Sequence, residues 1–175
     1  FFPSSRRDDP PAYAREVIER FATRAFRRPP REDELESLLS VWREGYERTR
    51  DFQGSVRHAL FVILTSPQFL YLTEESAGPQ AEPLSSHELA AKLSYFLWNT
   101  MPDERLLTLA AKGTLGASLR AEAERLVADE RFSQFTGEFV SQWLSLDKFD
   151  VVNINRGRYP RLLKETQREL RKEAI

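Results

Sequence analysis

The sequence LSSHELAAKLSYFLWNTMPD at residues 84–103 decides the fold class. Ser85 and Glu88 have the spacing of a capping box, in which each side chain binds the other residue's backbone amide at a helix start. A main apolar stripe follows with helical period: Leu89, Leu93, Phe96 and Leu97. Tyr95 and Trp98 project to the opposite side, so we predict a helix that lies between two layers. Thr100 has the character of a second helix cap.

Three helices are predicted on the N-terminal side. Pro10 and Pro11 open the first, which ends before Pro29 and Pro30. The second begins at about residue 31 with three acids in its first turn, where the helix dipole favours negative charge. The arginine-rich end of the first helix is expected to pair with these acids. The third runs over about 52–65 and is apolar all round, which predicts a central helix covered on several sides.

The C-terminal side is also predicted to be helical. One helix starts near Thr100 and stops at Gly113, and another covers about 117–128. The sharpest amphipathic stripe follows: Phe132, Phe135, Phe139, Trp143 and Leu146. Its spacing predicts that Phe139 and Trp143 anchor a core. An irregular stretch at 147–159 precedes a final helix that opens at Pro160.

The sequence therefore predicts an all-α protein of about seven to eight helices in two packed helical modules, with an irregular loop near 147–159. Residues 73–84 have the composition of a linker, with Gly78, Pro79 and Pro83 and few large apolar side chains. We predict a first module at 1–76 and a second, C-terminally truncated module at 77–175. Tyr95 and Trp98 need cover on the outer side of their helix, so they are candidate partner-binding residues.

Composition excludes several classes of function. The chain has no cysteine, so it forms no disulfide, thiolate zinc site or covalently attached haem of its own. Its 26 basic and 27 acidic side chains nearly cancel, which argues against a general electrostatic grip on nucleic acid. The longest apolar run, residues 59–64, is too short to span a bilayer. The first residue is not Met, and we expect a fragment or processed piece of a longer protein.

No catalytic constellation is visible. His58 and His87 are the only imidazoles, and both are interpreted as surface or helix-start residues. Nucleotide-binding loops and the G-x-S-x-G nucleophile setting are absent. An alternative remains open, in which acids such as Asp103, Asp147 and Asp150 line an enzyme site for a polymer or small molecule that absent domains complete.

Oxygen-bearing side chains gather in one loop: Asp147, Asp150, Asn153 and Asn155. Calcium prefers such ligands, but the loop lacks the turn glycine and the bidentate glutamate of an EF-hand. Asp and Asn also hydrogen-bond to their own backbone in turns. We therefore predict a structural loop and no metal site.

Several separated motifs occur in the order of a known pair of helical domains: RAFRRP at 24–29, HALFVILTSPQFLY at 58–71, the 84–103 stretch, FVSQWL at 139–144 and RYP at 158–160. In these motifs the chain resembles paired domains of unknown function from large planctomycete and myxobacterial proteins. The resemblance implies an exported multidomain protein that often bears a planctomycete-type cytochrome c domain.

Any haem would then lie elsewhere, since this chain has no Cys-x-x-Cys-His, and the resemblance carries over no catalytic residue. We expect a non-catalytic helical scaffold or partner-binding region. Its partners would be other domains of the same protein or a protein partner, without nucleic acid, and its setting would be periplasmic or at the cell surface.

Overall fold

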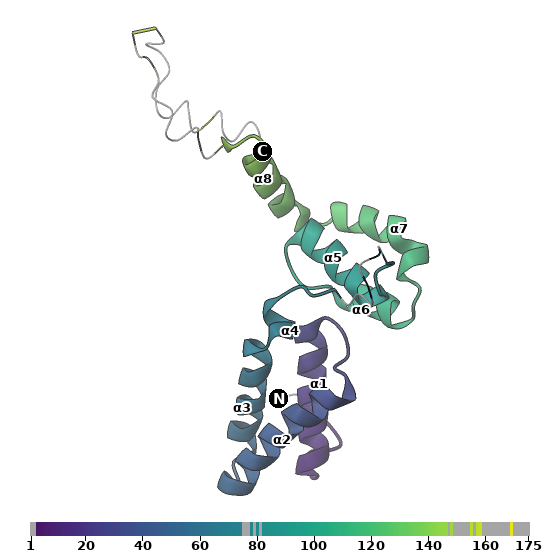
Figure 1. Cartoon of the computed structure of the whole chain (residues 1–175), viewed down its shortest axis with the longest axis vertical. Helices are drawn as coiled ribbons and strands as arrows, with labels where there is room; N and C mark the ends of the chain where they lie inside the picture. The colour runs from purple at the N-terminus through teal and green to yellow at the C-terminus, as the bar shows by residue number, and fades with distance from the viewer. Residues whose placement is uncertain are drawn as a thin grey trace. The chain divides into compact units, whose positions relative to one another are not determined.

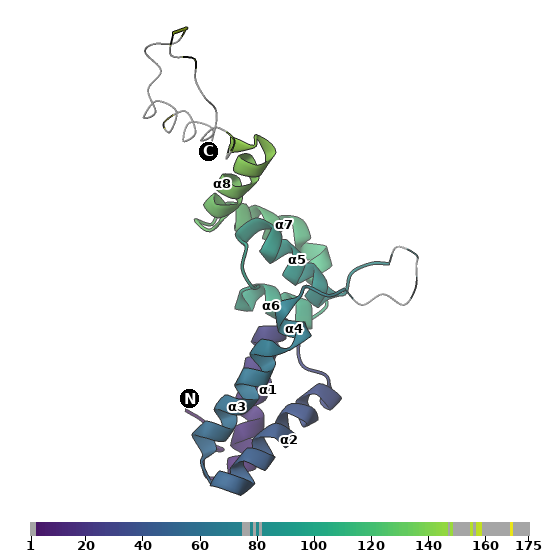
Figure 2. The same ribbon diagram turned by 60° about the vertical axis from the view of Figure 1, so that its left-hand side comes forward.

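The computed structural model describes residues 3–74, 78, 80, 82–146, 148, 155, 157, 158 and 169. These residues form eight helices and no strand, so the all-α prediction is confirmed (Figures 1 and 2). The helices are α1 (Pro10–Phe26), α2 (Glu32–Thr49), α3 (Phe52–Thr65), α4 (Pro67–Leu70), α5 (Ser86–Trp98), α6 (Glu104–Ala111), α7 (Leu115–Val127) and α8 (Phe132–Trp143). Most of the predicted irregular loop at 147–159 lies outside the described residues.

The chain divides into two compact units, which are described separately. One contains residues 1–92 and 101–118, and the other contains residues 93–100 and 119–175. In the first unit, α1, α2 and α3 lie side by side around one apolar core (Figure 1). The fully or almost fully buried side chains of this core include Ala14, Ile18, Ala22, Leu35, Val56, Ala59 and Ile63.

Aromatic rings close one end of this core. Tyr13 and Phe52 stack at 5.3 Å, and Trp42 and Tyr46 stack at 5.1 Å. Phe52 also meets Trp42 edge to face at 6.0 Å. The indole nitrogen of Trp42 is buried, and no described group forms a hydrogen bond with it. Packing of rings between helices fixes the register of α1, α2 and α3.

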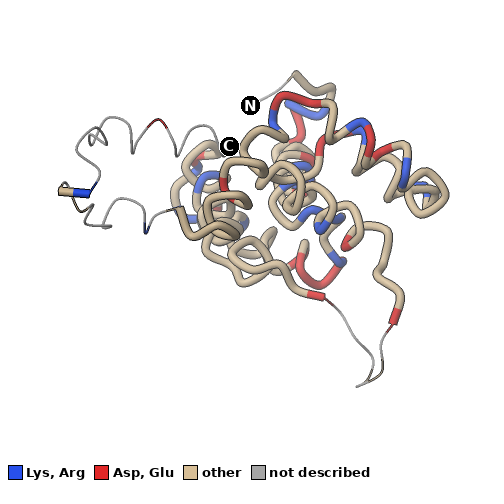
Figure 3. Tube along the Cα trace, turned by 90° about the horizontal axis from the view of Figure 1, so that it is seen from above, with Lys and Arg blue, Asp and Glu red and all other residues tan. Residues whose placement is uncertain are grey.

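The starts of α1 and α3 agree with the prediction, and the structure shows that an aspartate caps each of them. Asp9 caps α1 through the amide of Ala12, and Asp51 caps α3 through the amide of Gly54. Arg15 on α1 pairs with Glu32 at 2.7 Å and with Glu36 on α2 at 3.0 Å. In the arginine-rich stretch at the end of the first helix, Arg28 pairs with Glu34 at 2.8 Å, which confirms the predicted pairing with the acids at the start of α2. Elsewhere on the described trace, basic and acidic positions are interspersed, with uncharged stretches between them (Figure 3).

The predicted start of α6 is wrong by one turn. Thr100 is not its cap, because the Asp103 carboxylate accepts the amide hydrogen of Leu106 at 2.9 Å and α6 begins at Glu104. Pro102 gives the reason. The residue before a proline is driven out of helical geometry, so Met101 cannot form a first turn.

The outer face of α3 is exposed, contrary to the expectation of a helix covered on several sides. Val56, Ala59 and Ile63 face the core, whereas Phe61 is 66% exposed and Leu64 is 40% exposed. Among the described helices, α3 packs against α1, α2 and α4. Even this most apolar helix is too short for a bilayer, and no described helix combines the length and hydropathy of a membrane span.

The second unit is organised around Trp98, which is fully buried at the end of α5. Its indole nitrogen donates to the carbonyl of Leu126 on α7 at 2.9 Å. The guanidinium groups of Arg125 and Arg131 lie 5.4 and 3.4 Å from the ring centroid. Glu122, only 1% exposed, accepts from Arg125 at 2.8 Å. Cation–π contact and ion pairing therefore enclose the indole ring.

Truncating a core residue of the first unit should lower its unfolding free energy much more than truncating an exposed residue. Ile18→Ala removes a fully buried side chain and should cost about 2–5 kcal/mol of unfolding free energy, because it leaves a cavity between three helices. Phe61→Ala, in the same unit, should cost less than about 0.5 kcal/mol. Urea unfolding followed by circular dichroism measures both. Equal losses would contradict the observed exposure of Phe61.

Candidate functional site

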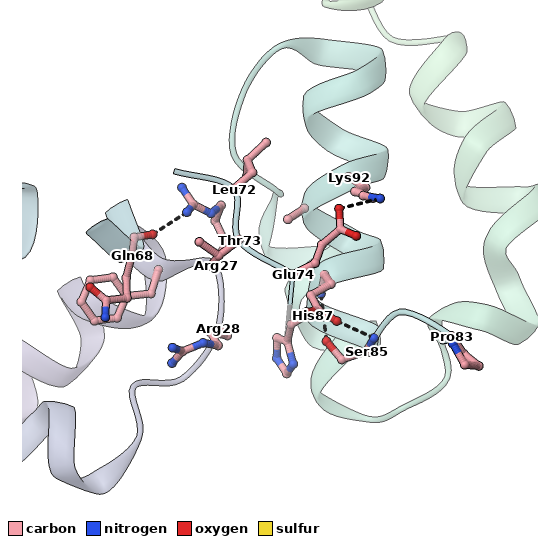
Figure 4. A pocket seen from close by; sticks show the side chains of 13 residues that line it. Arg27, Arg28, Gln68, Leu72, Thr73, Glu74, Pro83, Ser85, His87 and Lys92 are labelled. Carbon is pink, nitrogen blue, oxygen red and sulfur yellow. Dashed lines mark hydrogen bonds and ion pairs between the residues drawn. The ribbon is translucent and has the colours of Figure 1, made fainter. Parts of the chain in front are cut away.

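A pocket of the first unit lies where α1 ends, after α4, and where α5 starts. It has a volume of about 370 Å³. Polar and charged side chains make up much of its wall, among them Arg27, Arg28, Gln68, Glu74, Ser85, His87, Glu88 and Lys92 (Figure 4). Two arginines, one lysine and one histidine would suit an anionic ligand if their charges were free.

Arg27 is a structural residue of this pocket. It ends α1 in the left-handed conformation (φ 62°), and it is only 6% exposed. Its guanidinium donates to the carbonyl oxygens of Gln68 at 2.5 Å, Tyr71 at 2.8 Å and Phe69 at 3.3 Å (Figure 4). These carbonyls belong to α4 and the residue that follows it. Arg27 therefore ties the end of α1 to α4.

Arg28 is held by an acid. Its two terminal nitrogens donate to the two carboxylate oxygens of Glu34, both at 2.8 Å, in the bidentate geometry that gives strong ion pairs. The backbone amide of Arg31 donates to the same carboxylate at 2.7 Å. The hydrogen bonds from Arg28 are the main cause that lowers the pKa of Glu34 from 4.5 to about 2.

The α5 side of the pocket is arranged by the predicted capping box, which is confirmed. The Ser85 amide donates to the Glu88 carboxylate at 2.7 Å, and the Glu88 amide donates to the Ser85 hydroxyl at 3.3 Å. Lys92 pairs with Glu74 at 2.7 Å (Figure 4). Most of the charge around the pocket is thus already committed to bonds within the unit.

His87 is half-buried in the same wall. Burial, and secondly the positive charge of Arg28, lower its pKa, so the imidazole is neutral at pH 7. A neutral imidazole can accept one proton and donate another, which is the minimum for acid–base chemistry. No group of three His, Cys, Asp or Glu side chains within the described residues could hold a metal ion.

The loop at 147–155, which we predict to be structural and not calcium-binding, is only partly described. Asp147, Asp150 and Asn153 lie outside the described residues. The side-chain oxygen of Asn155 accepts from the amides of Gly157 at 3.1 Å and Arg158 at 3.2 Å. Asn155 therefore does what asparagine commonly does in a turn, which was the alternative to metal binding. Asp103, the third acid considered for an enzyme site, is occupied as the cap of α6.

The two candidate partner-binding residues have different environments. Trp98 is fully buried against Leu126, Arg125 and Arg131, so its ring offers no docking surface in this structure. The residues that cover Trp98 lie about 30 positions further along the chain, so the helical pattern of α5 alone could not predict its burial. Tyr95, on the same helix, is half-buried and keeps some accessible surface.

Two apolar surfaces were not predicted. The first, called the α3–α4 surface, consists of Phe61, Leu64, Phe69, Leu70, Tyr71 and Leu72, which are 37–66% exposed. The second, called the aromatic ladder, consists of Phe96 on α5 and Phe132, Phe135, Phe139 and Trp143 on α8.

The aromatic ladder corrects the prediction that Phe139 and Trp143 anchor a core. They are 48% and 73% exposed in the structure. Consecutive rings of the ladder lie 5.1–5.9 Å apart, so the rings cover one another on one side only. Helical period identifies an apolar stripe, but it does not tell whether another element covers that stripe.

Comparison with family models gives two matches along the chain. A model described as PSD4, protein of unknown function (DUF1592), matches residues 84–175, which is more than half of the chain. The chain belongs to the DUF1592 family. A second model, PSD5, protein of unknown function (DUF1595), matches residues 13–74 of this DUF1592 protein. Comparisons with curated proteins and with solved structures gave no significant match.

The two matches divide the pocket between them. Arg27, Arg28 and Gln68 lie in the residues matched by the DUF1595 model, and Ser85, His87 and Lys92 lie in the DUF1592 match. The α3–α4 surface belongs to the first match and the aromatic ladder to the second. Paired domains of unknown function, expected from the separated motifs, are thus present.

Removing the donors of Arg27 should destabilise the first unit. Arg27→Met keeps the aliphatic stem but leaves three backbone carbonyls without their charged donor, so we expect a loss of about 2–3 kcal/mol in urea unfolding. Arg24→Met, at an exposed position of the same helix, should leave stability nearly unchanged. An Arg27→Met protein that unfolds like the parent would show that these hydrogen bonds contribute nothing.

The Arg28–Glu34 pair should make stability depend on acid pH. The pKa of Glu34 is lowered on folding, so its stabilisation is complete above about pH 4.5 and disappears as the pH falls towards 2. Glu34→Gln should therefore cost about 1–2 kcal/mol near neutral pH, after allowance for solvent screening, and almost nothing at pH 2. Thermal unfolding from pH 2 to 7 measures the difference. Glu47→Gln controls for the loss of one negative charge from α2, and a pH-independent Glu34→Gln effect would argue against the ion pair.

Proposed function

We propose that this chain is a non-catalytic helical scaffold that binds another domain of its own protein or a protein partner. The α3–α4 surface is the observation that carries the proposal. Soluble monomers rarely expose large contiguous apolar areas unless those areas bind something. Here Phe61, Leu70 and Tyr71 are each 59% exposed or more, on adjacent elements of one unit.

Helices α3 and α4 are held in place on the side away from this surface, which suits a binding role. Val56, Ala59 and Ile63 fix the inner face of α3 in the core, and Arg27 fixes α4 through its carbonyl oxygens. Four exposed side chains of this surface therefore project from helices that are already in place, and Tyr71 and Leu72 directly follow α4. Binding of a partner then costs little conformational entropy, because this surface is already ordered before the partner binds.

The chemistry of the pocket also supports a structural role for this region. Arg27, Arg28 and Lys92 direct their charges to carbonyls or carboxylates of the same unit. The neutral His87 also has acid–base character, but no hydrogen bond from another described residue orients its imidazole, and a single imidazole is a weak basis for catalysis. We therefore interpret the pocket as a joint between α1, α4 and α5.

The wider setting is part of the same proposal. It places the scaffold in an exported, periplasmic or cell-surface protein of planctomycete type, in which other domains carry the haem. The motif resemblance supports this setting, and the absence of cysteine assigns any covalent haem to other parts of the protein. The scaffold would then position domains that transfer electrons.

Hydroxyl-radical footprinting of the whole gene product tests the scaffold function. The side chains of Phe61, Leu70 and Tyr71 should be oxidised several-fold more slowly in the whole protein than in this chain alone, because neighbouring domains cover them. Val127, which is 46% exposed on α7 and lies outside both apolar surfaces, serves as the internal control. Equal oxidation rates at the three positions in both samples, with or without added haem protein, would refute the proposal.

A further inference from the structure

We propose that the aromatic ladder is the docking surface for the C-terminal segment of this same chain, residues 160–175. The proposal goes beyond the scaffold function, because it concerns a different surface in the other unit. It assigns the occupant of the ladder and leaves the α3–α4 surface as the open apolar surface for a partner.

The ladder needs an apolar occupant. Each aromatic side chain buries roughly 150–250 Å² when it is covered, so the three exposed rings of the ladder are a large apolar area, and Phe132 and Phe135 are half-buried beside them. Trp143 is 73% exposed, Phe96 64% and Phe139 48%. Glu138 is the only charged residue from 132 to 146. An occupant is therefore selected by apolar contact and shape, and not by opposite charge.

The C-terminal segment has a matching pattern. Drawn as a helix from Pro160, its sequence places four apolar side chains on one face, with Thr166 and Glu173 in the same arc: Leu162, Leu163, Leu170 and Ala174. Basic residues fall on the opposite face: Lys164, Arg168 and Lys172. Proline is well tolerated in the first turn of a helix, and Glu169, the described residue of this segment, is helical.

Both faces belong to one domain. The DUF1592 match runs without interruption from residue 84 through α8 to residue 175. The ladder and the segment thus each present one apolar face within the same matched domain. A helix of 16 residues is about 24 Å long, and α8 is about 18 Å long, so one can cover the other. Residues 147–159 can extend to roughly 40 Å, which is enough to bring the segment back along α8 in either direction.

Because the chain lacks cysteine, two introduced cysteines can be labelled without interference. Thr136→Cys lies near the middle of α8, and Gln167→Cys lies near the middle of the segment. Packed helices have axes roughly 10 Å apart, so spin labels at these sites should lie within about 20 Å of each other whichever way the helix runs. Double electron–electron resonance on the full chain measures this distance.

Dilution with unlabelled chain distinguishes the two sources of a short distance. A short distance that persists after dilution supports docking within one chain. A short distance that disappears on dilution shows that a second copy occupies the ladder. A distance distribution that is broad or centred beyond about 30 Å shows that the segment does not dock there. Either of these two results would overturn the proposal.

Trp143 provides a second readout on matched variants. The emission of Trp143 is obtained by subtracting the spectrum of Trp143→Phe from that of the parent. It should shift to longer wavelength when Leu163→Asp and Leu170→Asp are combined. Lys164→Gln with Arg171→Gln makes the same change in net charge on the basic face and should leave the emission unchanged. If acrylamide already quenches Trp143 fully in the parent chain, or if both double variants behave alike, the segment does not cover the ladder.

Discussion

Much of the first unit depends on the buried guanidinium of Arg27. Helix α4 has only four residues, too few to be stable by its own hydrogen bonds. Arg27 supplies three donors to the carbonyls of Gln68, Phe69 and Tyr71 and so fixes α4 against the end of α1. The left-handed conformation of Arg27 ends the helix and is part of the same joint. The pocket wall and the position of Leu70 and Tyr71 on the α3–α4 surface follow from this one residue.

Local features of the structure could be predicted from the sequence. Asp9, Asp51, and Ser85 with Glu88 cap helices where their spacing indicates, since a cap involves residues only three positions apart. The exception at α6 is also local. Thr100 and Asp103 are both good caps, and Pro102 decides between them by keeping Met101 out of helical geometry. Both residue types are common helix caps, so cap propensity alone does not choose between them. The backbone restriction that Pro102 places on the residue before it decides the choice.

Burial could not be predicted in the same way, as Trp98 and Trp143 show. Both lie on apolar faces of amphipathic helices, yet one is fully buried and the other 73% exposed. Trp98 is covered by the carbonyl of Leu126 and by two guanidinium groups that arrive from a different part of the sequence. Arg27 is a similar case, because its acceptors lie more than 40 residues away. Such partners come from parts of the chain that only the tertiary fold brings together, so helical periodicity does not predict them.

The use of charge in both units bears on how the protein recognises others. Several basic groups form ion pairs with acids of their own unit: Arg28 with Glu34, Lys92 with Glu74, Arg125 with Glu122, and Arg131 with Asp129. Paired charges produce little field at a distance, so they contribute little to steering a partner or a charged ligand. Most of the accessible apolar side chains, by contrast, lie on helices. Recognition then depends on buried area and fit, which suits a lasting contact between domains of one protein better than rapid capture of a small charged ligand.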